Sequence, residues 1–255
     1  MIKRIFTLGI LAQLSLSALT FAQTKVVAHR GAWKNTAVPQ NSIAALKEAI
    51  KMGCDGSEFD VHMSADSVIF VNHDAHIQGI PMETTSSQVL SAIKLENGES
   101  LPTLEAYLKA GLKQKKTRLV LEIKPSAVSK ERGIALARKV VEVVNATKAA
   151  SKVDYISFDY EICKEITRIA PKATVQYLNG NKAPDELLAD GVHGLDYHFS
   201  VLEKNPTWIK DANSKKLITN AWTVNDEKVM DRLIAEGIKL ITTDEPELLL
   251  KKLRK

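Results

Sequence analysis

The most constraining feature of this chain is the alternation of short, β-branched runs with longer amphipathic stretches. We predict strands at Lys25–His29, Gly56–His62, Arg118–Lys124, Val153–Phe158, Ala173–Leu178, Val192–Tyr197, Leu217–Thr223 and Lys239–Thr242. We predict helices at Ser42–Met52, Leu104–Leu112, Ser129–Lys148, Tyr160–Ile169, Pro184–Ala189, Val201–Asn213, Asp226–Ala235 and Pro246–Leu253. Eight strands that are each followed by a helix are typical of a (β/α)8 barrel, also called a TIM barrel.

Signals at the ends of the predicted helices agree with this pattern. Gly53 and Gly237 follow the first and seventh helices, Asn225 or Asp226 can cap the seventh, and Pro246 can open the eighth. No Gly/Ser-rich or Pro-rich linker divides the chain. We therefore expect one barrel domain over residues 23–255.

One repeat is longer than the others, with residues 63–103 lying between the second strand and its helix. The strand-like run Ser67–Asn72 follows the second strand too closely for a helical crossover, so we expect the two to pair antiparallel. We interpret the stretch as a small insertion on a strand-to-helix loop. Insertions of this kind lie over the functional face of a barrel.

Residues 1–22 have the features of a secretory signal peptide. Lys3 and Arg4 precede the uncharged run Ile5–Phe21, and the small residues Thr20 and Ala22 stand before Gln23. The alternative is a membrane anchor, but the apolar run is short for a span and no basic cluster follows it. We expect cleavage after Ala22, export to the periplasm or the medium, and no stable membrane anchor.

Charge and cysteine content exclude other classes. Lys and Arg number 35 against 30 Asp and Glu, and loss of Lys3 and Arg4 with the expected signal peptide lowers the net charge from +5 to +3, which is too small to indicate a nucleic-acid partner. We interpret basic runs such as residues 113–116 (KQKK) as solvated helix ends. Cys54 and Cys163 fall in different repeats, and we expect two separate thiols. The oligomeric state cannot be predicted from these features.

Charged side chains gather where the first three predicted strands end, which is the functional end of a barrel. The first strand ends with His29 and Arg30, the second carries Glu58 and Asp60, and the third carries Glu122 and Lys124. Strand side chains alternate between faces, so both members of each of the last two pairs share a face. Three carboxylates on adjacent strands would repel one another without a cation, and with one they form the oxygen shell that Mg²⁺ or Ca²⁺ prefers.

Each of these motifs has an ordinary structural explanation when it is taken alone. An isolated E-x-D is usually a solvated face, an E-x-K is often a salt bridge, and a lone histidine is more often packing than catalysis. Their joint occurrence at one predicted barrel end, with His73 in the insertion, favours a functional site. His62 could face the same cavity, His193 reads as structural, and His198 could border the pocket. Trp222 could form an apolar wall for a small alcohol or pack the barrel top, and Phe158 has the same two interpretations.

These residues resemble the glycerophosphodiester phosphodiesterase family over nearly all of the chain after residue 22. The matching blocks, in order, are His29-Arg30-Gly31, Pro39-Gln40-Asn41-Ser42, Glu58-Phe59-Asp60-Val61, His73-Asp74, Leu101-Pro102-Thr103-Leu104-Glu105, Glu122-Ile123-Lys124, Ala221-Trp222-Thr223-Val224-Asn225 and Thr243-Asp244-Glu245-Pro246. Two departures stand out: Gln40 occupies a position that is usually Glu, and Pro81–Thr85 replaces an Arg-Thr-Thr run.

The resemblance implies a TIM barrel with an insertion after the second strand. It implies Glu58, Asp60 and Glu122 as ligands of one divalent cation, Mg²⁺ or Ca²⁺, and His29 and His73 as base and acid, in that preferred order. Arg30 and Lys124 match positions near the phosphate. The implied reaction is hydrolysis of a small glycerophosphodiester to glycerol 3-phosphate and an alcohol, with water or the glycerol 2-hydroxyl as nucleophile.

Three alternatives remain open from the sequence. A phosphatidylinositol- or sphingomyelin-cleaving enzyme on a similar barrel would use an apolar rim on the insertion, for which Ile77, Ile80, Pro81 and Met82 are available. A non-catalytic protein could hold a phosphorylated ligand at the barrel mouth. A glycoside hydrolase could use two glutamates as a carboxylate pair, which would leave both histidines without a role.

Overall fold

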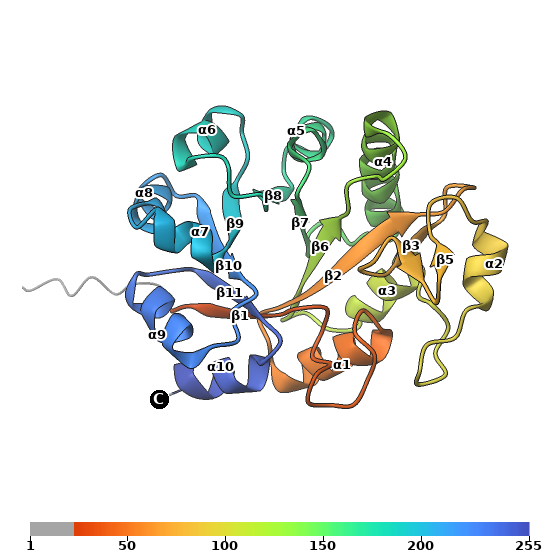
Figure 1. Cartoon of the computed structure of the whole chain (residues 1–255), viewed down its shortest axis with the longest axis horizontal. Coiled ribbons are helices and arrows are strands. Elements are labelled where there is room, and N and C mark those ends of the chain that lie inside the picture. The colour runs from red at the N-terminus through yellow and green to blue at the C-terminus, as the bar shows by residue number, and fades with distance from the viewer. Residues whose placement is uncertain (1–22, 255) are drawn as a thin grey trace, which may run out of the picture.

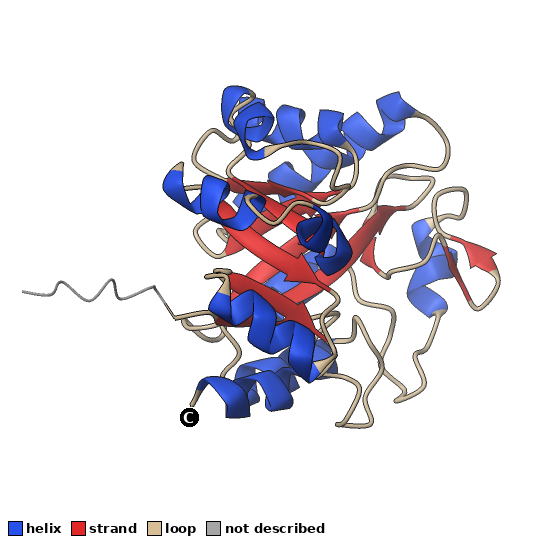
Figure 2. Cartoon of the chain, turned by 60° about the vertical axis from the view of Figure 1, so that its left-hand side comes forward, coloured by secondary structure: helices blue, strands red, loops and turns tan. Residues whose placement is uncertain are grey.

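The computed structural model describes residues 23–254, and the signal peptide predicted at residues 1–22 lies outside this range. The described residues form a closed barrel of eight parallel strands ringed by helices (Figures 1 and 2). The barrel strands are β1 Lys25–Ala28, β2 Gly56–Met63, β6 Arg118–Ile123, β7 Val153–Ser157, β8 Thr174–Tyr177, β9 Gly194–His198, β10 Ile218–Trp222 and β11 Leu240–Thr243. Each strand pairs with the next, and β1 pairs with both β11 and β2, which closes the ring. The predicted (β/α)8 fold is confirmed.

The helices pack around the outside of the strands (Figure 2). They are α1 Ile43–Met52, α3 Leu104–Gly111, α4 Lys130–Ala146, α5 Tyr160–Ile169, α6 Pro184–Ala189, α7 Phe199–Lys204, α8 Trp208–Ser214, α9 Glu227–Ala235 and α10 Pro246–Leu253. Their starts follow local chemistry: the side chains of Ser42, Thr103, Ser129 and Asp226 each accept a hydrogen bond from a first-turn backbone N–H. Of the two caps considered for the seventh predicted helix, Asp226 is the one used.

The helix predicted at Val201–Asn213 is wrong, because the structure has the two helices α7 and α8 there. Pro206 lies between them. Proline has no backbone N–H to donate, and its ring disfavours helical geometry in the residue before it. Asn205 accordingly leaves the helical region, with φ −126° and ψ 70°.

The stretch after β2 is a small folded unit beside the barrel mouth (Figure 1). Its first strand, β3 Ile69–Val71, pairs antiparallel with the end of β2, as predicted. It also contains the hairpin β4 His76–Ile77 and β5 Ile80–Pro81 and the helix α2 Ser87–Ala92, which the sequence pattern did not reveal. A hydrophobic cluster of its own holds the unit together; it includes Phe70, Ile77, Met82, Leu90 and Leu101. His73 is therefore carried on an ordered support.

Apolar residues fill two places in the molecule. The main core lies between the strands and the helices and includes Cys54 and Cys163, which are free, buried thiols as expected. A smaller cluster of Val27, Val120, Ile156 and Leu178 lies inside the barrel. Within residues 23–254, none of the helices combines the length and apolar character needed to cross a bilayer.

Candidate active site

The three carboxylates predicted as metal ligands come together at the carboxyl end of the barrel. Glu58 and Asp60 point inward from β2, and Glu122 points inward from the adjacent position on β6, where it is the register partner of Asp60. One carboxylate oxygen from each lies within 4.8 Å of the others, and all three residues are buried. The alternation of side chains along two neighbouring strands is sufficient to produce this cluster.

Electrostatics in the acidic cluster are unfavourable unless it takes up positive charge. Burial and the charge of Asp60 raise the pKa of Glu122 to about 8, and burial with the same neighbour raises the pKa of Glu58 well above its usual range. Burial also opposes ionisation of Asp60, but Lys124 and His73 outweigh it and lower that pKa. Oε1 of Glu58 is buried without a hydrogen-bond partner. A divalent cation would satisfy this oxygen and offset the carboxylate charge, so the residues fit such an ion.

Two residues with left-handed backbone hold the cluster in place. Asn41, at φ 60°, donates from Nδ2 to Oδ2 of Asp60 at 2.8 Å and accepts from the Asp60 N–H at 3.1 Å. Arg30, at φ 55°, donates its backbone N–H to Oε2 of Glu58 at 2.8 Å. Non-glycine residues in this region cost roughly 1–3 kcal/mol each and persist where surrounding contacts over-determine them. The strained loops therefore serve to aim the carboxylates.

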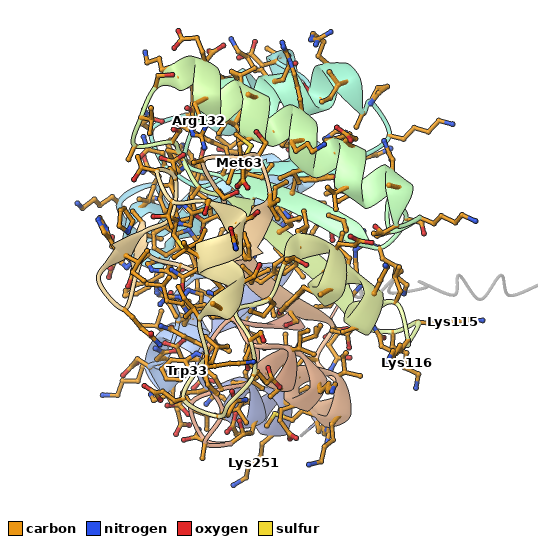
Figure 3. The ribbon with its side chains drawn as sticks, turned by 90° about the vertical axis from the view of Figure 1, so that its right-hand side faces the viewer. Trp33, Met63, Lys115, Lys116, Arg132 and Lys251 are labelled. Atoms are coloured by element: carbon orange, nitrogen blue, oxygen red, sulfur yellow. The ribbon has the colours of Figure 1, made fainter. Side chains whose placement is uncertain are left out.

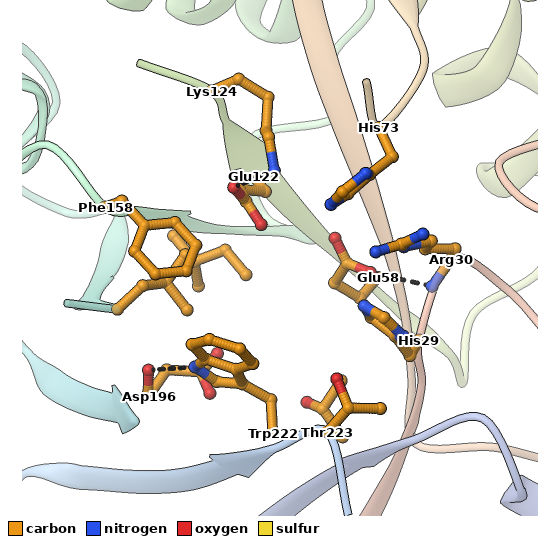
Figure 4. A pocket seen from close by; sticks show the side chains of 13 residues that line it. His29, Arg30, Glu58, His73, Glu122, Lys124, Phe158, Asp196, Trp222 and Thr223 are labelled. Carbon is orange, nitrogen blue, oxygen red and sulfur yellow. Dashed lines mark hydrogen bonds and ion pairs between the residues drawn. The ribbon is translucent and has the colours of Figure 1, made fainter. Parts of the chain in front are cut away.

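The two candidate acid–base histidines line the same cavity (Figure 4). Each has an aspartate at Nδ1. Nδ1 of His29 lies 2.7 Å from Oδ1 of Asp244, and Nδ1 of His73 lies 2.7 Å from Oδ1 of Asp74. When Nδ1 carries the proton and donates it to the carboxylate, Nε2 is left as the reactive nitrogen. Burial lowers the pKa of His73, although the charge of Asp60 opposes the change.

Three further side chains support the histidines, and the sequence did not point to these roles. Nδ2 of Asn225 donates to Oδ2 of Asp244 at 2.8 Å, which fixes the carboxylate that faces His29. Nε2 of His62 lies 3.1 Å from the carbonyl oxygen of His73 and so anchors the loop that carries it. Asp244 directly follows β11 at the carboxyl end of the barrel. That location is the signal that identified the other site residues, so the same rule could have found it.

Arg30 and Lys124 place positive charge on either side of the acidic cluster. Nζ of Lys124 lies 2.8 Å from Oε1 of Glu122 and 3.3 Å from Oδ1 of Asp60. Nη1 of Arg30 donates to the amide oxygen of Gln40 at 2.8 Å. Because Gln40 is neutral, it positions the guanidinium without cancelling its charge. The guanidinium therefore stays available to an anion at the mouth, although Glu58 and Asp60 lie nearby.

The far wall of the cavity is apolar. Phe158 and Trp222 lie edge to face with ring centroids 5.3 Å apart, and the indole N–H of Trp222 donates to the carbonyl oxygen of Asp196 at 2.8 Å. The cavity between this wall and the charged residues is about 110 Å³ and reaches the buried carboxyl of Asp196, whose pKa burial raises to about 7. It therefore has room for a small substrate group.

The remaining histidines do not line this cavity. His198 packs against Trp222 with ring centroids 5.2 Å apart, and its Nδ1 lies 2.8 Å from Oγ of Ser200. His193 accepts a hydrogen bond from the backbone N–H of Val175 at 3.3 Å. His198 is thus a supporting neighbour of the aromatic wall, and His193 is structural.

The arrangement combines a candidate cation site, two aspartate-paired imidazoles, two cationic side chains and an apolar wall around one small cavity. Such a set can bind an anion, stabilise developing negative charge and move protons at two points. A carboxylate pair for glycoside hydrolysis would leave the imidazoles and cationic groups unused.

Comparison with known proteins gives concordant results. The chain is 28% identical over 250 residues to the glycerophosphodiester phosphodiesterase of Caldanaerobacter subterraneus subsp. tengcongensis, covering 91% of this chain and 99% of that protein. It is 46% identical to a glycerophosphodiester phosphodiesterase of known structure from Parabacteroides distasonis, with a TM-score of 0.89 over 91% of this chain and 97% of that one. A phosphodiesterase from Oleispira antarctica, solved with sn-glycerol-3-phosphate as its product, shares the fold at 23% identity, with a TM-score of 0.79 over 91% and 98% of the two chains.

The family model described as "Glycerophosphoryl diester phosphodiesterase family" matches residues 29–248, a range that begins at His29 and includes every predicted site residue. The chain therefore belongs to the glycerophosphoryl diester phosphodiesterase family.

Proposed function

We propose that this protein hydrolyses small glycerophosphodiesters to glycerol 3-phosphate and an alcohol, in a reaction that depends on a divalent cation. The observation that carries the proposal is the convergence of the buried acidic cluster and two aspartate-paired histidines on one cavity of about 110 Å³. The names of the relatives in the same family describe this activity. The function thus follows from both the chemistry of the site and the family.

The candidate cation site consists of Glu58, Asp60 and Glu122. A divalent cation held there would supply Lewis-acid stabilisation of the phosphoryl charge and would lower the pKa of a reacting hydroxyl. All-oxygen ligands suit Mg²⁺ and Ca²⁺ equally well, so we propose one of these two ions. Arg30 and Lys124 bind the phosphate oxygens, with the charge of Lys124 shared between substrate and cluster.

The two histidines divide the proton transfers. A general base must begin neutral, and burial lowers the pKa of His73, so we assign the base role to His73. His29, whose Nδ1 lies 2.7 Å from Oδ1 of Asp244, takes the complementary role of acid. This is the reverse of the order preferred from the sequence. His73 accepts the proton of the attacking water or 2-hydroxyl, and His29 donates a proton to the departing alkoxide. Attack by the 2-hydroxyl gives a cyclic phosphate, which a water molecule must then open to yield glycerol 3-phosphate.

The apolar wall fits the part of the substrate that carries no phosphate charge. Phe158 and Trp222 can cover carbon atoms of the glycerol or of a small alcohol, and we propose Trp222 as a substrate-binding residue on this basis. The lipid-cleaving alternative needed an apolar rim on the insertion. Ile77 and Met82 instead lie buried in the cluster inside that unit, which leaves Ile80 and Pro81 as its only accessible members. Small, water-soluble diesters are therefore the better substrates.

The decisive experiment measures hydrolysis of glycerophosphocholine, glycerophosphoethanolamine and glycerophosphoinositol before and after treatment with EDTA. We expect turnover that chelation abolishes and that either Mg²⁺ or Ca²⁺ restores, which would also identify the ion. Sphingomyelin and phosphatidylinositol serve as the comparison substrates and should turn over far more slowly. Hydrolysis that survives EDTA would remove the cation from the mechanism, and binding without turnover would support a phosphate-ligand binder.

We also propose that the protein is exported, on the basis of the signal-peptide features in residues 1–22. Cleavage after Ala22 would leave Gln23 as the first residue. Mass spectrometry of the protein recovered from periplasm and medium should find this terminus. An intact chain beginning at Met1 in the cytoplasm would contradict the proposal.

A further inference from the structure

A second cavity opens at the amino end of the barrel strands, opposite the candidate active site. We call it the basal cavity. At about 610 Å³, it is larger than the cavity at the carboxyl end. Inward-facing residues at the starts of the strands line it, including Lys25 on β1, Arg118 on β6 and Gln176 on β8. Val27 and Val120 of the interior apolar cluster form part of its inner surface, so it is separated from the catalytic residues.

The basal cavity concentrates the positive charge of the protein. Six cationic side chains and two carboxylates line it, an excess of four, whereas residues 23–254 together hold 32 cationic and 30 acidic residues, an excess of two. These charged residues are Lys25, Lys115, Lys116, Arg118, Lys152, Lys239, Asp55 and Asp154. A cleft lined by one sign of charge focuses its field and attracts ions of the opposite sign.

The two carboxylates are already engaged. Asp154 accepts hydrogen bonds from Nε and Nη2 of Arg118, and Oδ2 of Asp55 accepts the backbone N–H of Val26 at 3.0 Å. Among residues 23–254, no carboxylate lies within ion-pair distance of the five lysines of the cavity. Their charges therefore face the cavity and its rim without a directly paired carboxylate.

The basic rim is an ordered structure. The side-chain oxygen of Gln114 accepts the backbone N–H groups of Lys116 and Thr117 at 2.7 and 2.8 Å, and its Nε2 donates to the carbonyl oxygen of Thr117 at 2.8 Å. Figure 3 shows Lys115 and Lys116 extending from this loop at one end of the molecule. Deeper in, Nζ of Lys239 donates to the carbonyl oxygen of Leu217 at 2.6 Å, and burial lowers its pKa. Lys115 and Lys116, at the end of the basic run 113–116, thus line the cavity.

Two neutral side-chain oxygens of residues that line the basal cavity, Oε1 of Gln176 and Oδ1 of Asn220, also lack a hydrogen-bond partner. Gln176 is 1% exposed, lines the cavity, and its Oε1 has no hydrogen bond. A buried amide oxygen without a donor is costly, and burial of this kind is normally compensated by a donor from protein, water or ligand. The lysines would attract an anion, whereas the amide oxygen of Gln176 can accept a hydrogen bond from a donor such as a hydroxyl group.

We propose that the basal cavity binds a small phosphorylated sugar or polyol. Its phosphate would contact the lysines, chiefly Lys25 and Lys239, and a hydroxyl group would donate to Gln176. This site is distinct from the candidate active site and lies at the other end of the barrel. It does not depend on the proposed hydrolytic activity.

The test is calorimetric titration of the protein with ribose 5-phosphate in EDTA at physiological salt, where no cation can recruit phosphate to the acidic cluster. We expect binding, and we expect none with ribose. The double variant Lys25→Ala/Lys239→Ala should weaken binding at least about tenfold, because it removes two charge-assisted contacts. The control Lys47→Ala/Lys210→Ala removes the same charge from two exposed positions outside the cavity and should leave Kd within about twofold.

Other variants locate the probe and test the hydroxyl contact. Arg30→Ala at the candidate active site should not change binding, and loss of binding there would overturn the proposal. Gln176→Leu should weaken the binding of ribose 5-phosphate. It should not weaken the binding of inorganic pyrophosphate, which has no sugar hydroxyl to donate to Gln176. The site would be excluded if the titration gave no heat of binding up to about 10 mM ribose 5-phosphate. It would also be excluded if Lys25→Ala/Lys239→Ala and its control bound ribose 5-phosphate with equal affinity.

Discussion

The two ends of the barrel use equivalent inward-facing positions on the same strands but carry opposite charge. On β6, Arg118 opens the strand toward the basal cavity, and Glu122 points into the mouth near its end. Between them, Val120 belongs to the apolar cluster that divides the interior. Strand geometry alone therefore does not distinguish the ends. The difference lies in which charges are buried and in what can compensate them.

At the mouth, the charges are carboxylates buried against one another, and the pKa values of Glu58 and Glu122 are raised. At the base, Lys25, Lys115 and Lys116 are exposed, while Asp154 is paired with Arg118. Buried like charges are costly, whereas exposed ones are screened. Without a cation, repulsion between the buried carboxylates therefore destabilises the mouth. The base is stable without a ligand, and its positive charge still attracts anions.

The strongest test of the difference between the two ends is to neutralise one acidic residue at each end. Glu122→Gln should lower kcat/KM by about 10³-fold or more, because it removes a candidate ligand of the cation. Asp154 is its counterpart at the base, on the neighbouring strand β7. Asp154→Asn should leave kcat/KM within about threefold of the parent value, but it should lower folding stability because the ion pair with Arg118 is lost. Kinetics with glycerophosphoethanolamine and thermal unfolding measure the two effects. A comparable loss of activity in both variants would show that the ends are not functionally separate.

The next largest effect is expected from the variants that test the acid and base roles of the two histidines. His29→Ala should lower kcat/KM by about 10²–10⁴-fold with glycerophosphoethanolamine, and by much less with a p-nitrophenol leaving group, which departs without a proton. His73→Ala should impair both substrates alike, because the nucleophile still needs a base. His76, exposed on the insertion, is the control, and His76→Ala should change little. Equal losses for both substrates in His29→Ala would reverse the two roles.

Cation binding should stabilise the mouth in a way that depends on pH. Without a cation, Glu58 and Glu122 have raised pKa values, so folding stability falls as pH rises from about 4.5 toward 8. A cation must displace these protons, so Mg²⁺ or Ca²⁺ should raise Tm more at pH 8 than at pH 6. At a hundredfold excess over Kd the gain is about 2.7 kcal/mol. The check is thermal unfolding with Glu122→Gln as control, and an equal gain in that variant would contradict the assignment.

The smallest expected effect concerns Asp196, which lies between the mouth and the barrel interior. Its pKa is raised by burial to about 7, above the usual 3.8, so it disfavours folding increasingly as pH rises from about 4 to 7. Asp196→Asn should therefore be no more stable than the parent near pH 4 and more stable at pH 8, by on the order of 2 kcal/mol. Urea unfolding at both pH values measures this. A difference that does not change with pH would mean that Asp196 is not held protonated.

The elements of the fold were largely predictable from local pattern. Alternating β-branched and amphipathic stretches identified all eight barrel strands, and the short spacing between β2 and β3 predicted their antiparallel pairing. The division of the helix predicted at Val201–Asn213 into α7 and α8 has a local cause in Pro206, which a stricter use of the sequence would have found. The hairpin β4–β5 was missed because strands of two residues carry no periodicity.

The sequence alone was sufficient to place the acidic cluster, because alternation along neighbouring strands dictates which side chains share a face. It could not assign Asp244 to His29 or Asn41 to Asp60, since these partners are 215 and 19 residues apart. Nor could it reveal that scattered lysines line one cavity. Periodicity is a local property that each segment carries by itself, whereas hydrogen-bond partners, burial and pKa depend on which distant segments the closed barrel brings together.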